Sequence, residues 1–463
     1  MNKYREMFLK ETEDVDKRIF DKIKNNPKPD IIDLWSLSER RFIEWRQTHD
    51  FPVLMSHFDK TLRLFKEWKE ENNLTNEIII ATGFLTPFLE PKKSSKDKNL
   101  FLTKIVDDDI EFTVVNYQKV EGERTYLGST YHSTYIQTFT SYLDWLHARG
   151  QHQEILYINS RSSPNTNLER VFIHADVYVH RSDFELLKMG GISLPEKHGT
   201  LFRGKRLEFV NLCGIDLRGD IYFGEYGNLS CHYCACDNWI AEDFNMPTVK
   251  LEHCTVANFT MVSSKLQQWS FYNCNVSGDF YNSKLYSTKI VGGSFNPVLL
   301  DCTLVATHIH KEHGMPDNNF NGYKAFKKVY QAQGEDDIAR HYFIEENEWI
   351  RSNLKGWQFI TKSISFYYWE YGRKPHRIIY LSIAIIFTFG FIFWLGRAFI
   401  NSSGGTTNFG LGDGLYFSTI TFTTLGYGDF SPTGWLKLLC SLEAFLGVIN
   451  MGFLIAGYSN NKY

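Results

Sequence analysis

Residues 424 to 429 read Thr-Leu-Gly-Tyr-Gly-Asp and lie between two apolar stretches. Backbone carbonyl groups can replace the hydration shell of a cation when successive carbonyls point to one side. The backbone must then alternate between ordinary and positive φ values, and Gly426 and Gly428 allow this at little cost. The alternative is an ordinary Gly-Tyr-Gly turn. The preceding threonine, the following aspartate and the apolar flanks favour a cation site instead.

Two apolar segments flank this hexapeptide. Ile378 to Gly396 contains no charged residue, and Trp435 to Tyr458 contains only Lys437 and Glu443. An α-helix rises about 1.5 Å per residue, so each segment comes close to spanning the ~30 Å hydrocarbon core of a bilayer. The sequence therefore predicts membrane helices.

A third apolar segment, residues 413–423, is too short to cross a membrane. It fits a re-entrant helix, which can lie at membrane depth only where protein or a water-filled cavity surrounds it. The predicted order is therefore an outer helix at 378–400, this pore helix, the hexapeptide at 424–429, and an inner helix at 435–458.

In this order of elements, residues 377–463 resemble the pore module of two-transmembrane potassium channels. The resemblance implies an all-α module, K⁺ as the permeant ion, no organic cofactor, and a homotetramer, because one chain supplies only a quarter of the filter. It implies ion binding by the filter carbonyls and by the threonine hydroxyl, with these residues in the site: Thr424, Leu425, Gly426, Tyr427 and Gly428.

The same resemblance implies roles for residues around the filter. Asp429 is expected behind it, bonded to Tyr416 of the pore helix, and Glu443 is expected to support it by hydrogen bonding. Gly447 lies where such channels place a gating hinge, although a small residue for close helix packing is the alternative. Asn450 is expected to line the central cavity.

Basic residues set the expected orientation. Arg373, Lys374 and Arg377 precede the first apolar segment, whereas residues 401–434 contain no lysine or arginine. The positive-inside rule then places the N-terminus and residues 1–377 in the cytoplasm of a protein that crosses the plasma membrane twice. No apolar segment carries a regular arginine ladder, so voltage gating is not expected.

Residues 201–304 carry a repeat of five residues. Large apolar side chains recur at this spacing, slip by one residue, and resume: Leu251, Val256, Met261, Leu266, Phe271, Val276, then Phe280, Leu285, Ile290, Phe295 and Leu300. This pattern resembles pentapeptide-repeat proteins, which implies a right-handed quadrilateral β-helix with four pentapeptides in each coil. Stacked coils share one core, because a single coil cannot bury its apolar side chains alone.

Cysteines in this repeat allow two interpretations. Cys234, Cys254 and Cys274 are twenty residues apart, so they would stack in one inward column of a solenoid. The alternative is a zinc site built from Cys231, Cys234 and Cys236 with His232. The crowded spacing and the lack of a second ligand pair favour the column.

Residues 305–354 read as a helical linker, and residues 355–376 concentrate aromatic and apolar side chains beside the first membrane segment. This second stretch fits an interfacial slide helix at the lipid headgroups. A core helix of the cytosolic region is the alternative.

Residues 1–200 mix helical and strand-like patterns, including a strand expected at 77–85, and predict an α+β or α/β domain of unknown role, which could be a sensor. His174, Asp176, His180 and Asp183 could form a metal cluster, but scattered surface residues are the favoured explanation. No nucleotide-binding or catalytic motif stands out, so an enzyme is not expected. The net charge of −3 gives no indication of nucleic-acid binding.

The function predicted from the sequence is a tetrameric potassium-selective channel gated through its N-terminal cytosolic region, by an unknown ligand or protein partner at residues 1–304. Few residues follow the inner helix, so control is expected to enter through residues 305–377 and the first membrane helix. The alternative is a membrane-anchored pentapeptide-repeat scaffold or sensor in which ion flux is the output of ligand recognition.

Overall fold

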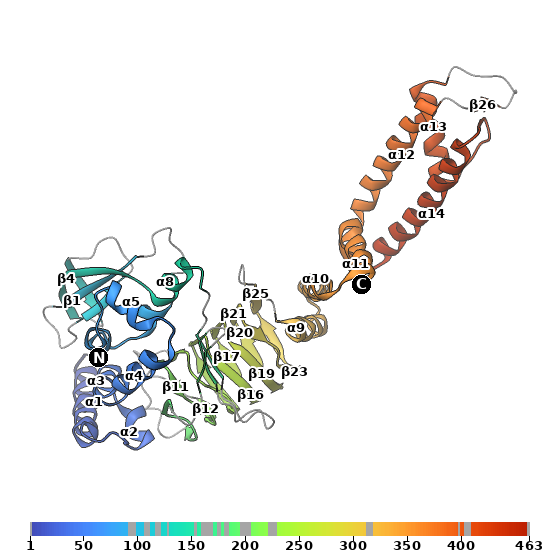
Figure 1. The fold of residues 1–463 in the computed structure, drawn as a ribbon. Coiled ribbons are helices and arrows are strands. Elements are labelled where there is room, and N and C mark those ends of the chain that lie inside the picture. Colours follow the sequence, from blue (N-terminus) through green and yellow to red (C-terminus); the bar gives the residue numbers. More distant parts are fainter. Residues whose placement is uncertain are drawn as a thin grey trace. The chain divides into compact units, whose positions relative to one another are not determined.

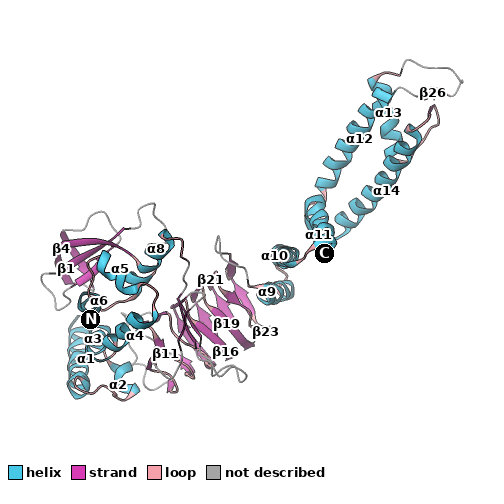
Figure 2. Ribbon diagram, in the orientation of Figure 1, coloured by secondary structure: helices cyan, strands magenta, loops and turns pink. Residues whose placement is uncertain are grey.

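The computed structural model describes residues 2–90, 99–105, 112–115, 122–126, 129–151, 155–158, 170–173, 177–179, 185–194, 205–220, 229–311, 318–396, 399–401 and 409–460. The chain forms two compact units, Met1–Val329 and Tyr330–Tyr463. The first unit holds an N-terminal mixed domain and a β-solenoid (Figures 1 and 2). The second holds the apolar helices. The four residues of the possible His/Asp cluster at 174–183 lie outside the described residues.

One long helix and six shorter ones open the described part of the first unit. They are α1 (Asn2–Ile23), α2 (Ile31–Ser36), α3 (Glu39–His49), α4 (Phe51–Thr61), α5 (Phe65–Glu71), α6 (Asn76–Ala81) and α7 (Thr86–Leu89). The strand expected at 77–85 is wrong, because α6 occupies its first half. The Thr75 hydroxyl accepts a hydrogen bond from the Ile78 N–H and caps this helix, which outweighs the β-branched run that follows.

Two antiparallel sheets follow. The first has the strand order β2-β1-β4-β3, with β1 (Asn99–Ile105), β2 (Phe112–Val115), β3 (Gly122–Tyr126) and β4 (Ser129–Thr140). After α8 (Tyr142–Ala148), a second sheet has the order β5-β6-β7, with β5 (Ile155–Ile158), β6 (Arg170–Ile173) and β7 (Val177–Val179). Helices beside antiparallel sheets make this an α+β domain.

Parallel strands then stack into a solenoid. One wall has the order β10-β13-β15-β18-β21-β25. These strands are β10 (Arg206–Glu208), β13 (Leu229–His232), β15 (Val249–Glu252), β18 (Ser270–Tyr272), β21 (Lys289–Val291) and β25 (His308–His310). Register partners such as Leu251 and Phe271 are one coil of twenty residues apart, and later partners such as Phe271 and Ile290 are nineteen apart.

A second wall of the solenoid, together with one pair of short strands, completes the coils. It contains β9 (Ser193–Leu194), β12 (Asp216–Asp220), β14 (Ile240–Pro247), β16 (Thr255–Val262), β17 (Lys265–Gln267), β19 (Asn275–Tyr281), β20 (Lys284–Tyr286), β22 (Ser294–Phe295), β23 (Val298–Leu300) and β24 (Thr303–Val305). The strands β8 (Leu187–Lys188) and β11 (Val210–Asn211) pair beside it. The coils thus begin before residue 201.

The five-residue period appears directly in the backbone. Positive φ values recur at every fifth residue from Tyr233 to Asn273: Tyr233, Asn238, Asp243, Thr248, His253, Asn258, Ser263, Gln268 and Asn273. The predicted apolar centres from Leu251 to Phe295 are buried, which confirms the repeat. Leu300 is the exception, because it is exposed. The register slips once more, so Leu299 and not Leu300 pairs with Phe280.

The predicted cysteine column is confirmed. Cys234, Cys254 and Cys274 are buried, and each thiol donates to a backbone carbonyl of the preceding coil. Burial raises the pKa of Cys231 and Cys254, which keeps these thiols protonated. Among the described residues, the thiols do not gather into a metal-binding group of three, so the zinc alternative built on cysteine finds no support.

The second unit is helical. After α9 (Phe320–Ala332), which crosses the boundary between the units, come α10 (Asp336–Asn353), α11 (Gly356–Trp369), the short 3-10 helix η4 (Glu370–Gly372), α12 (His376–Gly396), α13 (Leu411–Phe422) and α14 (Leu436–Asn460). A short antiparallel pair, β26 (Phe399–Asn401) and β27 (Phe430–Pro432), joins the segments at the far end of α12–α14 (Figure 1).

A substitution at Gly278 tests the packing of the coils. A Cβ atom at Gly278 would lie 2.0 Å from the carbonyl oxygen of Phe259 in the preceding coil, and its φ is +144°. We expect Gly278→Ala to lower the free energy of unfolding of the solenoid by about 3 kcal/mol, as overpacking does. Thermal unfolding checks this, with the exposed neighbour Ser277→Ala as control. Equal unfolding midpoints for both variants would contradict the coil packing described here.

Candidate functional site

Two helices of the second unit, His376–Gly396 and Leu436–Ser459, are long and apolar enough to cross a membrane. Their surfaces are apolar where they are exposed: Tyr380, Phe387, Leu395, Leu438, Phe445 and Ile455 are each more than half exposed. Such a surface is unstable in water and matches lipid or another apolar partner.

The short helix α13 packs against both long helices (Figure 1). Aromatic side chains from α12, the loop and α13 interlock here; the ring centroids of Phe393 and Phe417 are 5.2 Å apart, and those of Phe399 and Phe409 are 4.2 Å apart. Gly390 and Gly414 let the two helix backbones approach closely, because a Cβ at Gly414 would lie 2.5 Å from the Gly390 carbonyl oxygen. The protein thus surrounds one side of α13.

The residues after α13 adopt an alternating backbone. Thr424, Gly426 and Gly428 have positive φ values of 60°, 49° and 79°, whereas Leu425 and Tyr427 do not. The N–H groups of Leu425 and Gly426 both donate to the Ile420 carbonyl, at 2.8 and 3.3 Å, and so tie the segment to the end of α13. The helix macrodipole places partial negative charge at this end, which favours a cation there.

The alternating segment is exposed in the single chain. The residues from Thr423 to Gly428 are exposed, and Leu425 and Tyr427 are 60% and 69% exposed. Such large exposed apolar and aromatic side chains beside a polar backbone are unusual on the surface of a protein that has no further subunit. The segment thus offers carbonyl groups on a face that this chain alone does not cover.

Tyr416 and Asp429 come together as the resemblance implied. The Tyr416 hydroxyl lies close enough to the Asp429 carboxylate to interact with it. The ring of Tyr416 also lies edge-on to that of Phe430, with centroids 6.4 Å apart. This pair links the middle of α13 to the residue that closes the segment. Its role in supporting a filter stays a prediction.

Glu443 is fully buried and contacts Ser418 of α13. The Ser418 hydroxyl also lies 2.8 Å from the Ile386 carbonyl oxygen of α12. Ser418 can donate its one hydroxyl proton to only one of these oxygens, so a continuous chain across α14, α13 and α12 forms when a protonated Glu443 carboxyl donates to the Ser418 oxygen and Ser418 donates to the Ile386 carbonyl. Burial of a carboxyl group at membrane depth is costly unless it is hydrogen bonded, so this chain gives Glu443 a physical reason to face inward.

Gly447 lies in close contact with the end of α13. A Cβ at this position would lie 1.9 Å from the Phe422 carbonyl oxygen. Helix α14 continues through Gly447 without a break, from Leu436 to Asn460. The contact supports the packing alternative for this glycine. Its role as a hinge stays a prediction.

Asn450 is 3% exposed in the single chain and lies on the same packed face of α14 as Glu443 and Gly447. Its side-chain oxygen accepts a hydrogen bond of 2.5 Å from the Tyr368 hydroxyl of α11, and its amide donates to Leu446. The hydrogen bond with Tyr368 directs the Asn450 side chain toward α11. The role of Asn450 in lining a central cavity stays a prediction.

Sequence reasoning missed two residues that this geometry uses, Ser418 and Tyr368. Ser418 lies seven residues before Leu425 and is followed by two further hydroxyl residues of α13, Thr419 and Thr421, so sequence alone does not distinguish it from them. Tyr368 is one of several aromatic residues at the end of α11, and spacing alone does not distinguish it from Tyr367, which is 68% exposed.

Comparison with known proteins agrees with this arrangement. Residues 376–460 match the family described as "Ion channel". Over 58 residues the chain is 40% identical to mouse and human "Potassium channel subfamily K member 10" and 38% identical to rat "Potassium channel subfamily K member 2". These matches cover 12% of this chain and 11–14% of those relatives. The C-terminal unit therefore carries an ion-channel domain with two candidate membrane spans.

Substitutions of Gly447 and Gly452, two glycines of α14 in different surroundings, test the contact with α13. Nothing lies within 4 Å of a Cβ at Gly452, whereas Gly447 abuts the Phe422 carbonyl. We expect Gly447→Ala to lower the stability of the module by about 1–3 kcal/mol through overpacking. Gly452→Ala should leave the stability unchanged or raise it, because alanine favours helix. Thermal unfolding of the detergent-solubilised chain measures both, and destabilisation by both variants alike would contradict this contact.

Proposed function

We propose that the chain forms a potassium-selective channel whose filter is the segment from Thr424 to Asp429. The observation that carries the proposal is the alternation of positive and ordinary φ values at the end of a re-entrant helix between two apolar spans. Such a backbone turns successive carbonyls of Thr424, Leu425, Gly426 and Tyr427 toward one side, where they replace water around K⁺. The similarity to relatives named as potassium channels supports the choice of ion.

The proposal requires a homotetramer. One chain supplies one row of carbonyl groups, and a cage around an ion needs several rows around an axis. The exposed Leu425 and Tyr427 side chains are the surfaces that neighbouring copies would cover. The apolar faces of α12 and α14 would then contact lipid or the next subunit.

Membrane orientation follows from the basic residues. Arg373, Lys374 and Arg377 lie before or at the start of α12, and Glu370 holds Lys374 and Arg377 at 3.1 and 3.6 Å. The positive-inside rule places this end, and with it the N-terminal unit, in the cytoplasm. The amphipathic α11, with exposed Trp357, would lie at the headgroups of the plasma membrane.

Ion flux tests the channel directly. The full chain reconstituted in liposomes should conduct potassium with a strong preference over sodium, and barium should block this flux. We expect Gly428→Ala to abolish this selectivity, because alanine disfavours the positive φ of this position by about 1–2 kcal/mol. Gly412→Ala, in open space at the start of α13, is the control. Equal sodium and potassium flux in the unaltered chain would refute the proposal.

We further propose that the N-terminal region gates the pore through α10 and α11. The Tyr371 hydroxyl after α11 donates a hydrogen bond of 2.9 Å to Glu348 of α10, and Lys362 of α11 lies 2.6 Å from the side-chain oxygen of Asn347. Burial and the Glu348 carboxylate raise the pKa of Tyr371, so its hydroxyl stays a donor. These contacts make α10 and α11 move together.

Helix α11 also contacts the inner helix. Tyr368 bonds to Asn450, the rings of Trp369 and Phe453 are 5.1 Å apart, and a Cβ at Gly457 would lie 2.8 Å from the Pro375 side chain. The sequence suggested that control enters through the outer helix. These contacts support a more direct route, in which a shift of α11 biases α14 between two states.

Substitutions of Tyr368 and Tyr367 distinguish this route from a general effect of changing α11. Tyr368→Phe removes only the hydroxyl that bonds to Asn450, a loss of about 1 kcal/mol, which corresponds to a change of about fivefold in the open–closed equilibrium. Tyr367→Phe alters an exposed side chain and should leave gating unchanged. Single-channel recordings in planar bilayers measure the open probability. Identical open probabilities for the two variants would exclude Tyr368 from gating.

A further inference from the structure

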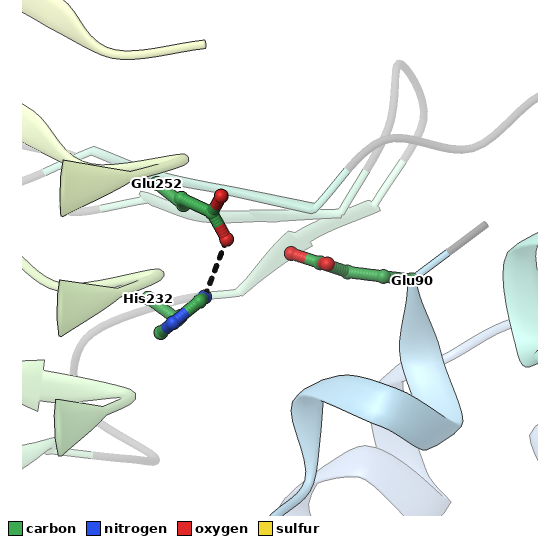
Figure 3. A group of neighbouring side chains, drawn as sticks. All are labelled: Glu90, His232 and Glu252. Carbon is green, nitrogen blue, oxygen red and sulfur yellow. Dashed lines mark ion pairs between the residues drawn. The ribbon is translucent and has the colours of Figure 1, made fainter. Parts of the chain in front are cut away.

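A group of three ionisable side chains lies where the N-terminal helices meet the first coils of the solenoid. Glu90 follows α7, His232 ends β13 and Glu252 ends β15, and the three side chains point toward one another (Figure 3). One possible ligand atom from each lies within 4.8 Å of the other two. His232 and Glu252 are register partners on neighbouring parallel strands, so the solenoid itself sets their spacing.

We propose that Glu90, His232 and Glu252 bind a divalent cation, with zinc as the best match. In the sequence, His232 entered only a disfavoured zinc alternative, with cysteine partners. The structure turns it instead toward two carboxylates. One imidazole nitrogen and two carboxylate oxygens are ligands that zinc takes, with water completing a four-coordinate site. Magnesium favours oxygen ligands and retains its water, so the histidine selects against it.

The orientation of His232 is the observation that separates this site from an acidic cluster. The residue is 5% exposed, and its Nε2 lies 3.1 Å from the Ser230 hydroxyl oxygen. When Nε2 donates to Ser230, Nδ1 presents its lone pair to the carboxylates. A histidine that binds metal characteristically donates its other ring N–H in this way.

Nδ1 lies 3.0 Å from Glu252 Oε2 without a hydrogen bond between them. A zinc ion about 2.1 Å from each of the two atoms would fit this separation. The geometry therefore allows a cation to be shared between the imidazole nitrogen and the carboxylate oxygen.

Neighbouring groups orient the carboxylates. Lys250 Nζ lies 2.9 Å from Glu252 Oε1, the other oxygen of that carboxylate. Glu90 interacts with the Tyr233 hydroxyl and lies 3.7 Å from His253 Nε2.

A cation here would join separate parts of the first unit. Glu90 belongs to the N-terminal domain, whereas His232 and Glu252 belong to successive coils of the solenoid. Glu208, one coil earlier, already ties the same region by accepting hydrogen bonds from the N–H groups of Leu85 and Thr86. Metal binding would reinforce this joint and raise the stability of the folded state by mass action.

Metal content of the full chain tests the proposal. Protein purified in detergent and stripped with a chelator is dialysed against zinc, manganese or magnesium, and bound metal is counted by mass spectrometry. We expect one zinc per chain that His232→Gln and Glu252→Gln both lose, and at least tenfold weaker binding of manganese and magnesium. His310→Gln, an exposed histidine of the last coil, is the matched control and should keep the zinc.

Thermal unfolding gives a second measurement. Zinc should raise the unfolding temperature of the unaltered chain and of His310→Gln, and should not do so for His232→Gln. If His232→Gln does not fold, the half-buried Glu90→Gln decides instead, because its side chain lies at the margin of the core. No bound zinc, or equal zinc in all variants, overturns the site and identifies an ion pair alone. Neither measurement depends on ion flux, so the result is independent of the proposed channel.

Discussion

The backbone at the end of α13 is the constraint on which the C-terminal unit depends. A helix that stops at membrane depth leaves carbonyl groups without partners, and lipid cannot satisfy them. Here the Ile420 carbonyl accepts N–H groups from Leu425 and Gly426, and the Phe422 carbonyl packs against Gly447. In the proposed channel, the carbonyls that follow turn to one side and replace water around a dehydrated cation.

The rest of the module holds this helix end in place from three directions. Glycines bring α12 against α13, Ser418 links Glu443 of α14 to the Ile386 carbonyl of α12, and Tyr416 reaches Asp429 at the end of the proposed filter segment. Each contact is short and directional, so the segment has little freedom to collapse. A rigid support of this kind is what selective coordination by a backbone requires.

Local chemistry made much of this predictable from the sequence. The glycine spacing in the filter, the apolar spans and the period of five each depend on neighbours along the chain, and the structure has the corresponding φ values, helices and coils. Prediction failed where distant contacts decide. Residues 76–81 became a helix under the Thr75 cap, and Leu300 lost its inward place to Leu299.

His232 shows most clearly why such partners stay hidden. Three cysteines lie within four residues of His232, and the zinc site weighed from the sequence, though not favoured, drew only on them as partners. In the solenoid, successive side chains leave opposite faces of each strand, so Cys231 points into the core while His232 points outward. The coil then brings Glu252, twenty residues away, beside His232, and the N-terminal domain supplies Glu90. A site assembled from one solenoid face and a separate domain has no sequence signature, because its spacing belongs to the fold.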